Sequence, residues 1–376
     1  MKDLSVYIHI PFCDHKCIYC DFYSLVSYDN ENRFFEILKK EIRHFSGLLQ
    51  DEYQIPTIFF GGGTPSFVDV AYISSVISEL KQSFKFKNKV EITLETNPGT
   101  VDQKKLEQFL DAGVNRLSVG IQSFNNDELK FLTRIHNEKT AIETVNGAHQ
   151  VGFENISIDL IFNLPGQSRE SWTYNLEKVI ELPVKHISAY SLILERGTIL
   201  NKMVLDGRIK MQDEDYDADL YETTIDFFIK NNFVQYEVSN FCKRGYECRH
   251  NLAYWKHKEY LGLGPSAHSF INKKRWWNIS SLKMYINSVE RIGNAILNTE
   301  QLEYEQLLDE FVMLNLRGSG LDIHELNSKF GATWISKNGS YLDKLSKGNY
   351  ITNSNNEIKF TKKGYLICDE ILINFK

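Results

Sequence analysis

Long apolar runs are absent from this sequence. No stretch approaches the roughly 18 uninterrupted apolar residues that a membrane-spanning helix needs. The first residues lead directly into a strand-like segment, without the basic and apolar regions of a secretory signal peptide. We therefore expect a soluble, cytoplasmic protein without an integral membrane span, while a peripheral association with a membrane surface stays open.

An excess of positive charge is also absent. Lys and Arg total 43 against 49 Asp and Glu, and the formal net charge is −6. Proteins that bind nucleic acid nonspecifically rely on a strong positive field, so nucleic acid is not an expected partner. Internal repeats and low-complexity tracts are lacking, and a hydrophobic content of 42% is ample for a sizeable core.

Cysteine is scarce, and its distribution is uneven. Three of the six cysteines, Cys13, Cys17 and Cys20, fall within eight residues. A disulfide framework is usually spread along the chain, and the Cys-x-x-Cys-His pattern of covalent haem attachment is missing. In a reducing compartment such tight spacing indicates metal binding or redox chemistry.

Strand-like and helix-like patterns alternate through the first 240 residues. The predicted strands are Leu4–Ile10, Thr57–Phe60, Val90–Leu94, Arg116–Val119, Ile156–Phe162 and Ile187–Leu194. The predicted helices are Glu31–Leu49, Val70–Phe84, Gln103–Ala112, Lys139–Val151 and Ser168–Ile180. Each strand–helix step takes about 30 residues, the length of a βα unit, which predicts an α/β fold with a parallel sheet. Periodicity alone does not distinguish a doubly wound sheet from an incomplete barrel.

Polar residues stand where several of these strands end. Glu95, Gln122 and Asp159 lie at or near the carboxyl ends of three predicted strands, and Gly61–Gly63 follows another. Barrel enzymes assemble their sites on that rim. Polar residues also begin loops simply because loops are solvated, but four coincidences favour a site.

The remainder of the chain differs in pattern. Residues 241–295 are rich in aromatic side chains and glycine turns, whereas residues 296–376 are again helical. Predicted helices Glu303–Leu316, Ile323–Phe330 and Lys337–Leu345 precede short strands around Tyr350–Ile351 and Ile358–Phe360, and a last helix follows Thr361. This order resembles a small winged-helix-like α+β domain. Nine Lys and Arg against ten Asp and Glu from residue 301 onward disfavour DNA binding, so we expect a packing or docking domain. The predicted domains are therefore 1–240, 241–295 and 296–376.

The cysteine triplet permits two kinds of metal centre. Three thiolates can ligate one face of a cubane iron–sulfur cluster, which leaves the fourth iron free for an external chelate. A structural zinc ion needs four ligands, and His9 or His15 would have to complete the set. A merely buried trio of cysteines is the third interpretation.

The spacing Cys-x3-Cys-x2-Cys with Tyr19 before the last cysteine resembles the signature of the radical SAM superfamily. Gly61-Gly-Gly-Thr-Pro65 follows its strand as that family's glycine motif does. The resemblance implies an incomplete (β/α)6 barrel and a [4Fe–4S] cluster on Cys13, Cys17 and Cys20. It also implies that S-adenosylmethionine (SAM) occupies the open iron and yields a 5′-deoxyadenosyl radical after one-electron reduction.

The resemblance narrows to the branch of oxygen-independent coproporphyrinogen oxidases and HemW-type haem chaperones. The matching segments are Thr93–Pro98, Leu117–Phe124, Arg134 and Ile158–Gln167. By this resemblance the SAM contacts are Tyr7, Tyr19, Gly62, Gly63, Thr64, Glu95, Gln122, Arg134 and Asp159. A guanidinium such as that of Arg134 suits the SAM carboxylate, although a surface ion pair would be the ordinary interpretation of an arginine alone.

Three departures separate this chain from the coproporphyrinogen oxidases. Phe22 occupies the position where those enzymes carry a further cysteine, and only twelve residues precede Cys13, whereas the enzymes have a longer extension. His250-Asn-x-x-Tyr254-Trp255 resembles the hallmark of the chaperone group. The resemblance therefore implies a chaperone that binds haem and transfers it to acceptor haemoproteins, respiratory ones among them. The alternative is a radical SAM enzyme, either a coproporphyrinogen III dehydrogenase or a methyltransferase.

His250 is the candidate haem ligand from this motif. Histidine is a common axial ligand of haem iron, and aromatic neighbours suit a porphyrin face. A histidine beside Asn and aromatics is more often a hydrogen-bonded packing element, so that role stays open. Cys242 and Cys248 are further candidates for haem contact, with ordinary buried thiols as the alternative.

Overall fold

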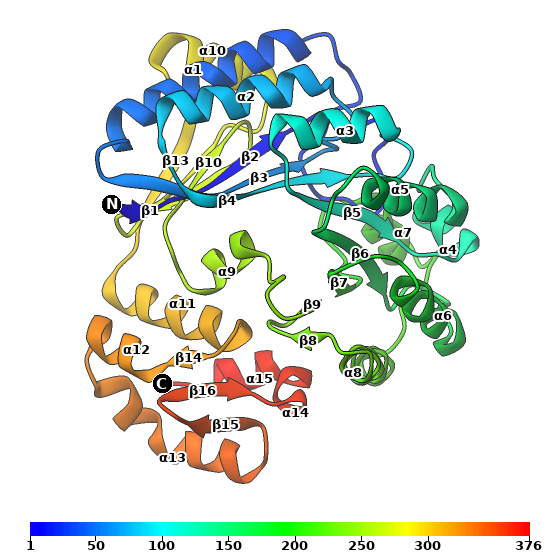
Figure 1. Cartoon of the computed structure of the whole chain (residues 1–376). Helices are drawn as coiled ribbons and strands as arrows, with labels where there is room; N and C mark the ends of the chain where they lie inside the picture. Colours follow the sequence, from blue (N-terminus) through cyan, green and yellow to red (C-terminus); the bar gives the residue numbers. More distant parts are fainter.

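Six parallel strands form the centre of the fold, in the order in which they occur in the chain (Figure 1). The computed structural model describes all residues, 1–376. The strands are β2 (Ser5–Ile10), β3 (Tyr53–Gly62), β4 (Lys85–Thr96), β5 (Arg116–Gln122), β6 (Ile156–Phe162) and β7 (His186–Ser191). β2 and β7 are not paired with each other, so the curved sheet is open. The predicted incomplete (β/α)6 barrel is confirmed.

One helix follows most strands and covers the outer face of the sheet (Figure 1). These helices are α1 (Glu31–Leu49), α2 (Val70–Ser83), α3 (Gln103–Ala112), α5 (Glu138–Gln150) and α6 (Arg169–Ile180). Asp69, Asp102, Asn137 and Ser168 precede four of them, and each side chain accepts a hydrogen bond from a first-turn N–H. Such caps satisfy amide groups that have no partner within the helix, which explains why the predicted starts are accurate.

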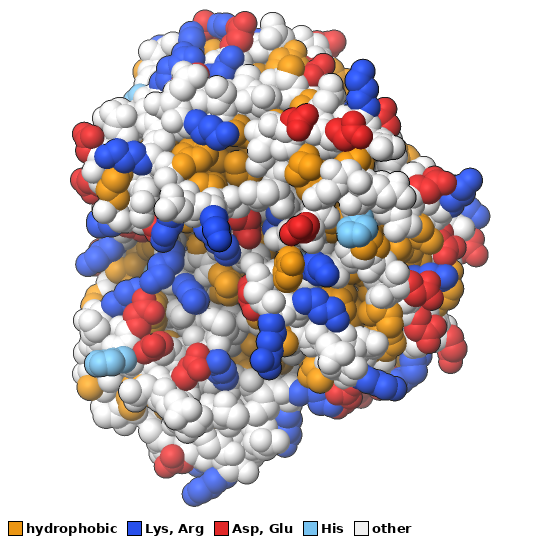
Figure 2. Space-filling view, in the orientation of Figure 1, with side chains coloured by type: hydrophobic (Ala, Val, Ile, Leu, Met, Phe, Trp, Pro, Cys, Tyr) orange, Lys and Arg blue, Asp and Glu red, His pale blue; other side chains and the backbone are white.

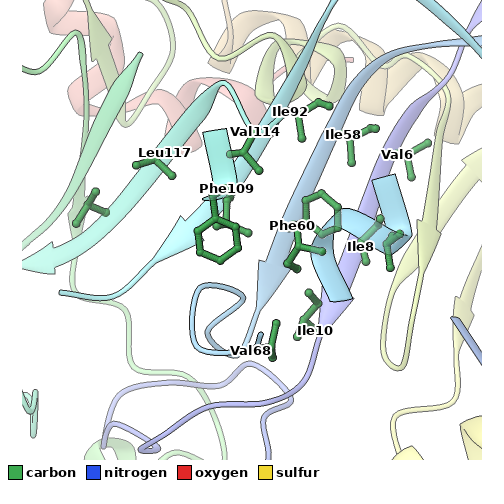
Figure 3. Packing of buried hydrophobic residues seen from close by; sticks show 14 of the residues in the cluster. Val6, Ile8, Ile10, Ile58, Phe60, Val68, Ile92, Phe109, Val114 and Leu117 are labelled. Carbon is green, nitrogen blue, oxygen red and sulfur yellow. The ribbon is translucent and has the colours of Figure 1, made fainter. Parts of the chain in front are cut away.

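Alternate residues of the strands face opposite environments. Val6, Ile8 and Ile10 of β2 and Ile58 and Phe60 of β3 point to the helices and are fully buried (Figure 3). The residues between them line the concave face, and on β4 to β7 these are largely polar. The chain thus buries an apolar layer under the helices while it presents functional groups to the interior, because side chains alternate along a strand.

Additional strands extend both edges of this sheet. On one side β10 (Tyr260–Leu263) pairs in parallel with β2, and β11 (His268–Ile271), β12 (Lys274–Asn278) and β13 (Ile296–Gln301) follow in antiparallel order. On the other side β9 (Asn240–Cys242) and the short β8 (Val234–Gln235) follow β7. The remaining helices that precede residue 296 are α4 (Asn126–Phe131), α7 (Ile199–Leu205), α8 (Glu214–Lys230), α9 (Arg249–Trp255) and α10 (Leu282–Ile292).

The last part of the chain has a hydrophobic core of its own. Phe311, Leu316, Leu326 and Ile358 are fully buried in a cluster separate from that of the large sheet. Its elements are α11 (Tyr304–Arg317), β14 (Leu321–Asp322), α12 (Ile323–Phe330), α13 (Thr333–Lys347), β15 (Ile351–Ser354), β16 (Glu357–Phe360), α14 (Lys362–Leu366) and α15 (Cys368–Ile373). The three strands form a small antiparallel sheet in the order β14-β16-β15, the wing expected from the sequence. The proposed domain boundaries at residues 240 and 295 stay a prediction.

Charged side chains of both signs cover the face of the molecule shown in Figure 2. Lys and Arg side chains gather on this face across the belt between the large sheet and the C-terminal part (Figures 1 and 2). No helix of the structure combines the length and the apolar character that crossing a bilayer requires.

A buried carboxyl group joins α1 to the added strands. Glu41 is fully buried and accepts hydrogen bonds from the Gly264 N–H (2.8 Å), Asn278 Nδ2 (2.8 Å) and Tyr285 Oη (2.6 Å). Burial outweighs these three donors and raises the pKa of Glu41 to about 7. The folded state therefore binds a proton more tightly than the unfolded state does.

Stability is expected to fall as the pH rises through this pKa. The contribution of protonated Glu41 is fully present below the ordinary carboxyl range and is lost as pH rises to about 7, with a slope of up to about 1.4 kcal/mol per pH unit. Urea unfolding at pH 5, 6, 7 and 8 measures this slope, and Glu41→Gln should reduce it because the amide does not titrate. Equal slopes in both proteins would contradict the assignment.

Candidate functional site

The cysteine loop lies at the carboxyl end of β2. The Cys13 N–H donates to the Leu25 carbonyl (2.9 Å), and this bond joins the two ends of the loop. The Cys13 Sγ lies 3.0 Å from Thr64 Oγ1 of the glycine loop, and the Arg134 guanidinium donates to Cys17 Sγ at 3.7 Å. The loop that carries all three cysteines is thus held between the ends of β2, β3 and β5.

The chemistry of the three thiols suits a metal cluster. All three are free, and burial raises the pKa of Cys17 and Cys20, the latter to about 11, while the charges of the neighbouring thiols add to the rise. Arg134 opposes this rise at Cys17. Thiolates concentrated in one buried loop repel one another, and cationic iron would relieve this repulsion by binding them in the deprotonated form. No three His, Cys, Asp or Glu side chains stand close enough together to hold a single metal ion.

The glycine loop after β3 touches this cysteine loop through its backbone. The Gly63 N–H donates to the Ile10 carbonyl (2.8 Å), and the Thr64 N–H donates to the Phe12 carbonyl (2.7 Å). A Cβ on Gly63 would lie 2.4 Å from the Phe12 carbonyl oxygen, and a Cβ on Gly62, which has φ +115°, would lie 2.7 Å from His9 Cε1. Only glycine satisfies the close approach and the left-handed backbone, so these residues are required to dock the two loops.

A network that the sequence interpretation missed connects Thr64 to Arg134. Asn97 Nδ2 donates to Thr64 Oγ1 (2.8 Å), and Asn97 Oδ1 accepts from Arg134 Nη2 (2.7 Å). The same guanidinium donates to the Gly120 carbonyl, and its buried Nε has no partner. Asn97 belongs to the segment Thr93–Pro98 that matches the family, and this match could have identified it as a site residue. The unsatisfied Nε of a buried cation suits an anionic group of a ligand.

Two half-buried carboxyl groups, Glu95 of β4 and Asp159 of β6, stand on the concave face on either side of β5. Glu95 accepts from the Gly62 N–H (3.2 Å), and Asp159 accepts from Ser118 Oγ (3.2 Å). Burial and the charge of Asp159 raise the pKa of Glu95 to about 8. Burial also raises the pKa of Asp159, although Ser188, Arg116 and Ser118 oppose this. Carboxyl groups whose pKa values are raised in this way suit a cationic or hydroxyl-bearing ligand.

The remaining residues predicted to bind SAM border the same region. Tyr7 lies next to Glu95, whose charge together with burial raises the pKa of the phenol well above its usual range. Arg134 is close enough to Tyr19 to act against the rise of the Tyr19 pKa that burial causes. Gln122 stands at a bulge after β5 with φ 71°, and its amide folds back over Gly120. Seven of the nine residues lie at or beyond the carboxyl ends of strands, whereas Tyr7 and Asp159 lie in the middle of β2 and β6.

His250 lies beside the middle of β3, against Thr57 and Phe59. Its Nδ1 lies 2.9 Å from Thr57 Oγ1 and its Nε2 2.9 Å from Tyr254 Oη, and the residue is 1% exposed. Glu91 accepts the His250 N–H and holds the start of α9. Cys248 is fully buried beside Glu91, and Cys242 is fully buried in β9. The assignment of His250, Cys242 or Cys248 to haem stays a prediction.

Comparison with known proteins agrees with this geometry. Residues 7–178 match the model of the radical SAM superfamily. The "Heme chaperone HemW" of Lactococcus lactis is 33% identical over 376 residues, which span 100% of this chain and 97% of the relative. The chain belongs to the HemW family. The Bacillus subtilis protein of the same name is 32% identical, with 98% of this chain and 97% of the relative covered.

Two further matches place the HemW-family chain among its relatives. A zebrafish protein, "Radical S-adenosyl methionine domain-containing protein 1, mitochondrial", is 32% identical over 98% of this chain and 86% of its own length. The solved structure of coproporphyrinogen III oxidase (HemN) from Escherichia coli superposes with a TM-score of 0.85 at 25% identity, covering 100% of this chain and 90% of that one. The whole chain, including its C-terminal part, therefore shares the architecture of that radical SAM enzyme.

Proposed function

We propose that Cys13, Cys17 and Cys20 hold a [4Fe–4S] cluster and that SAM binds the iron they leave open. When bound, the cluster supplies one-electron reduction of the SAM sulfonium. The support is the docking of the cysteine loop onto the glycine loop through Thr64, together with membership of a radical SAM family.

The protein's own residues orient SAM and exclude water. Arg134 has a buried Nε without a partner and receives the SAM carboxylate. The backbone of Gly62 and Gly63 approaches the amino-acid part of SAM, because these residues have no side chain to obstruct it. Glu95 and Asp159 face the cationic and hydroxyl groups, while Tyr7, Tyr19, Thr64 and Gln122 complete the border.

We propose that the protein is a cytoplasmic haem chaperone that binds haem as cargo and transfers it to acceptor haemoproteins. The observation that carries this proposal is full-length similarity to two proteins named heme chaperones, 33% and 32% identical. Phe22 supports it, since coproporphyrinogen oxidases carry a further cysteine at this position. Here the side chain is apolar and 61% exposed. Oxidation of a porphyrinogen is the second candidate, favoured by the TM-score of 0.85 with HemN.

One titration tests both candidates. Haemin added to the anaerobically reconstituted protein should produce a saturable Soret band, and an apo-haemoprotein added afterwards should take up the haem. In parallel, coproporphyrinogen III, SAM and a reductant are added to the same preparation. Formation of protoporphyrinogen with substrate-dependent 5′-deoxyadenosine, and no saturable haem binding, would replace the chaperone proposal by the enzymatic one.

A further inference from the structure

A cavity of about 780 Å³ opens beside the cysteine loop. Phe22 and Tyr23 of that loop border it on one side, β10 and β11 on another, and Met313 and Leu314 of α11 on a third. Tyr7 and His9 belong both to its wall and to the candidate SAM region. The cavity thus lies where the cysteine loop, the added strands and the C-terminal part of the chain meet.

Four histidines line this cavity, and the side chains of three of them are buried against other groups. His9 contacts Tyr7 Oη (3.1 Å) through Nδ1 and the Tyr23 carbonyl (2.9 Å) through Nε2. Both ring nitrogens of His250 are likewise hydrogen-bonded, as described above. The His257 Nε2 makes no hydrogen bond, but it lies 3.3 Å from a Glu310 carboxylate oxygen and the side chain is only 8% exposed.

His268 on β11 is the fourth histidine, and it is free. Its side chain is exposed in the cavity wall and makes no hydrogen bond to the rest of the chain. The ring stacks on Trp277 of β12 (5.8 Å between centroids, 22°), the residue directly opposite it in the sheet. The sheet thus holds in the cavity wall an imidazole that no other group of the chain binds, as an axial ligand of haem iron requires.

We propose that haem binds in this cavity and that His268 ligates its iron. This inference rests on the proposed chaperone function and adds to it the location of the cargo and the ligand. It assigns His250 to packing between β3 and α9, in agreement with the two hydrogen bonds of its ring.

The other walls suit an iron porphyrin. Tyr260, Phe270 and Leu314 offer apolar surface to a macrocycle, and the exposed Phe22 ring lies at the end nearest the cysteine loop. Ten of the twenty lining residues are hydrophobic, so a flat apolar ligand would lose much of its contact with water. Partial burial and the charge of Arg275 lower the pKa of His268, which favours the neutral imidazole that coordinates iron.

Haem titration of three variants tests the assignment. His268→Ala should weaken haem binding at least about tenfold and shift the Soret band, since the iron loses its protein ligand. Free imidazole should restore the wild-type spectrum of this variant, because it can fill the space left by the side chain. His268→Met should bind haem with the different spectrum of thioether ligation. His149→Ala is the control, since His149 is equally exposed but lies at the end of α5, outside the cavity.

The outcomes separate this inference from the proposed function. If the wild-type protein forms no saturable Soret band, the proposed chaperone function itself is overturned. A wild-type Soret band that His268→Ala leaves unchanged in position and affinity overturns only the assignment of His268. Equal losses in His268→Ala and His149→Ala also overturn it. Cluster absorbance and the urea midpoint of each variant establish folding, and if the alanine variant is unfolded, the spectrum of His268→Met decides.

Discussion

Anaerobic reconstitution of Cys17→Ala is expected to yield a protein without a [4Fe–4S] cluster. The cysteine loop provides only three thiolates for the cluster. A cluster left with two protein ligands loses iron readily. The brown absorbance of the reconstituted protein should disappear, and iron and sulfide should fall to the background of the assay. Binding of SAM should be lost with it, since the chelate would have no iron to occupy.

Cys368→Ala is the matched control for this result. Cys368 is 8% exposed and Cys17 is 9% exposed, so both variants remove a largely buried thiol. Cys368 belongs to the separate core of the C-terminal part, far from the cysteine loop in sequence. Its replacement should cost some stability while iron and sulfide stay at wild-type values. A cluster retained by Cys17→Ala, or lost equally by Cys368→Ala, would contradict the assignment of the ligands.

The barrel was predictable because its local signals agree with the final packing. The predicted helices Glu31–Leu49 and Gln103–Ala112 have the observed bounds, and β6 is Ile156–Phe162 as expected. Each of these segments has a clear periodicity and a capping residue or turn at its end. β3 and β4 are longer than predicted at their amino ends, since the starts Gln54–Ile55 and Lys85–Phe86 pair with each other across a register shift. β7 ends at Ser191, before the predicted Leu194, and Ile193 is exposed.

Contacts between distant segments could not be predicted in the same way. The pairing of β10 with β2 joins Tyr260 to Ser5, and no periodicity in either segment reveals which edge the strand will join. The bonds from Asn97 to Thr64 and Arg134 likewise join three separate loops. The free imidazole of His268 is visible only when the partners of the other histidines are known. Sequence patterns therefore gave the scaffold and the cysteine loop, whereas the wall of the cavity required coordinates.

SAM is expected to bind more tightly as the pH rises from 6 to 8. The pKa of Glu95 is about 8 in the free protein, because burial and Asp159 disfavour its charged form. The sulfonium and ammonium groups of SAM favour the ionised carboxylate, so SAM binding should release a proton from Glu95 below this pKa. The affinity should then rise by up to about tenfold per pH unit, or about 1.4 kcal/mol, and level off above about pH 8.

Equilibrium dialysis of the reconstituted protein against SAM at pH 6, 7, 8 and 9 measures this dependence. Glu95→Gln should flatten the profile, since the amide has no proton to release, and its affinity at pH 8 should be below that of the wild type. Glu41→Gln serves as the control, because burial raises the pKa of Glu41 as well, to about 7, but Glu41 lies between α1 and the added strands. It should keep the wild-type profile for SAM while it changes the pH dependence of unfolding. A wild-type profile that is flat between pH 6 and 8 would show that the cationic groups of SAM bind away from Glu95. A Glu41→Gln profile as flat as that of Glu95→Gln would show that the effect comes from a general change in the fold.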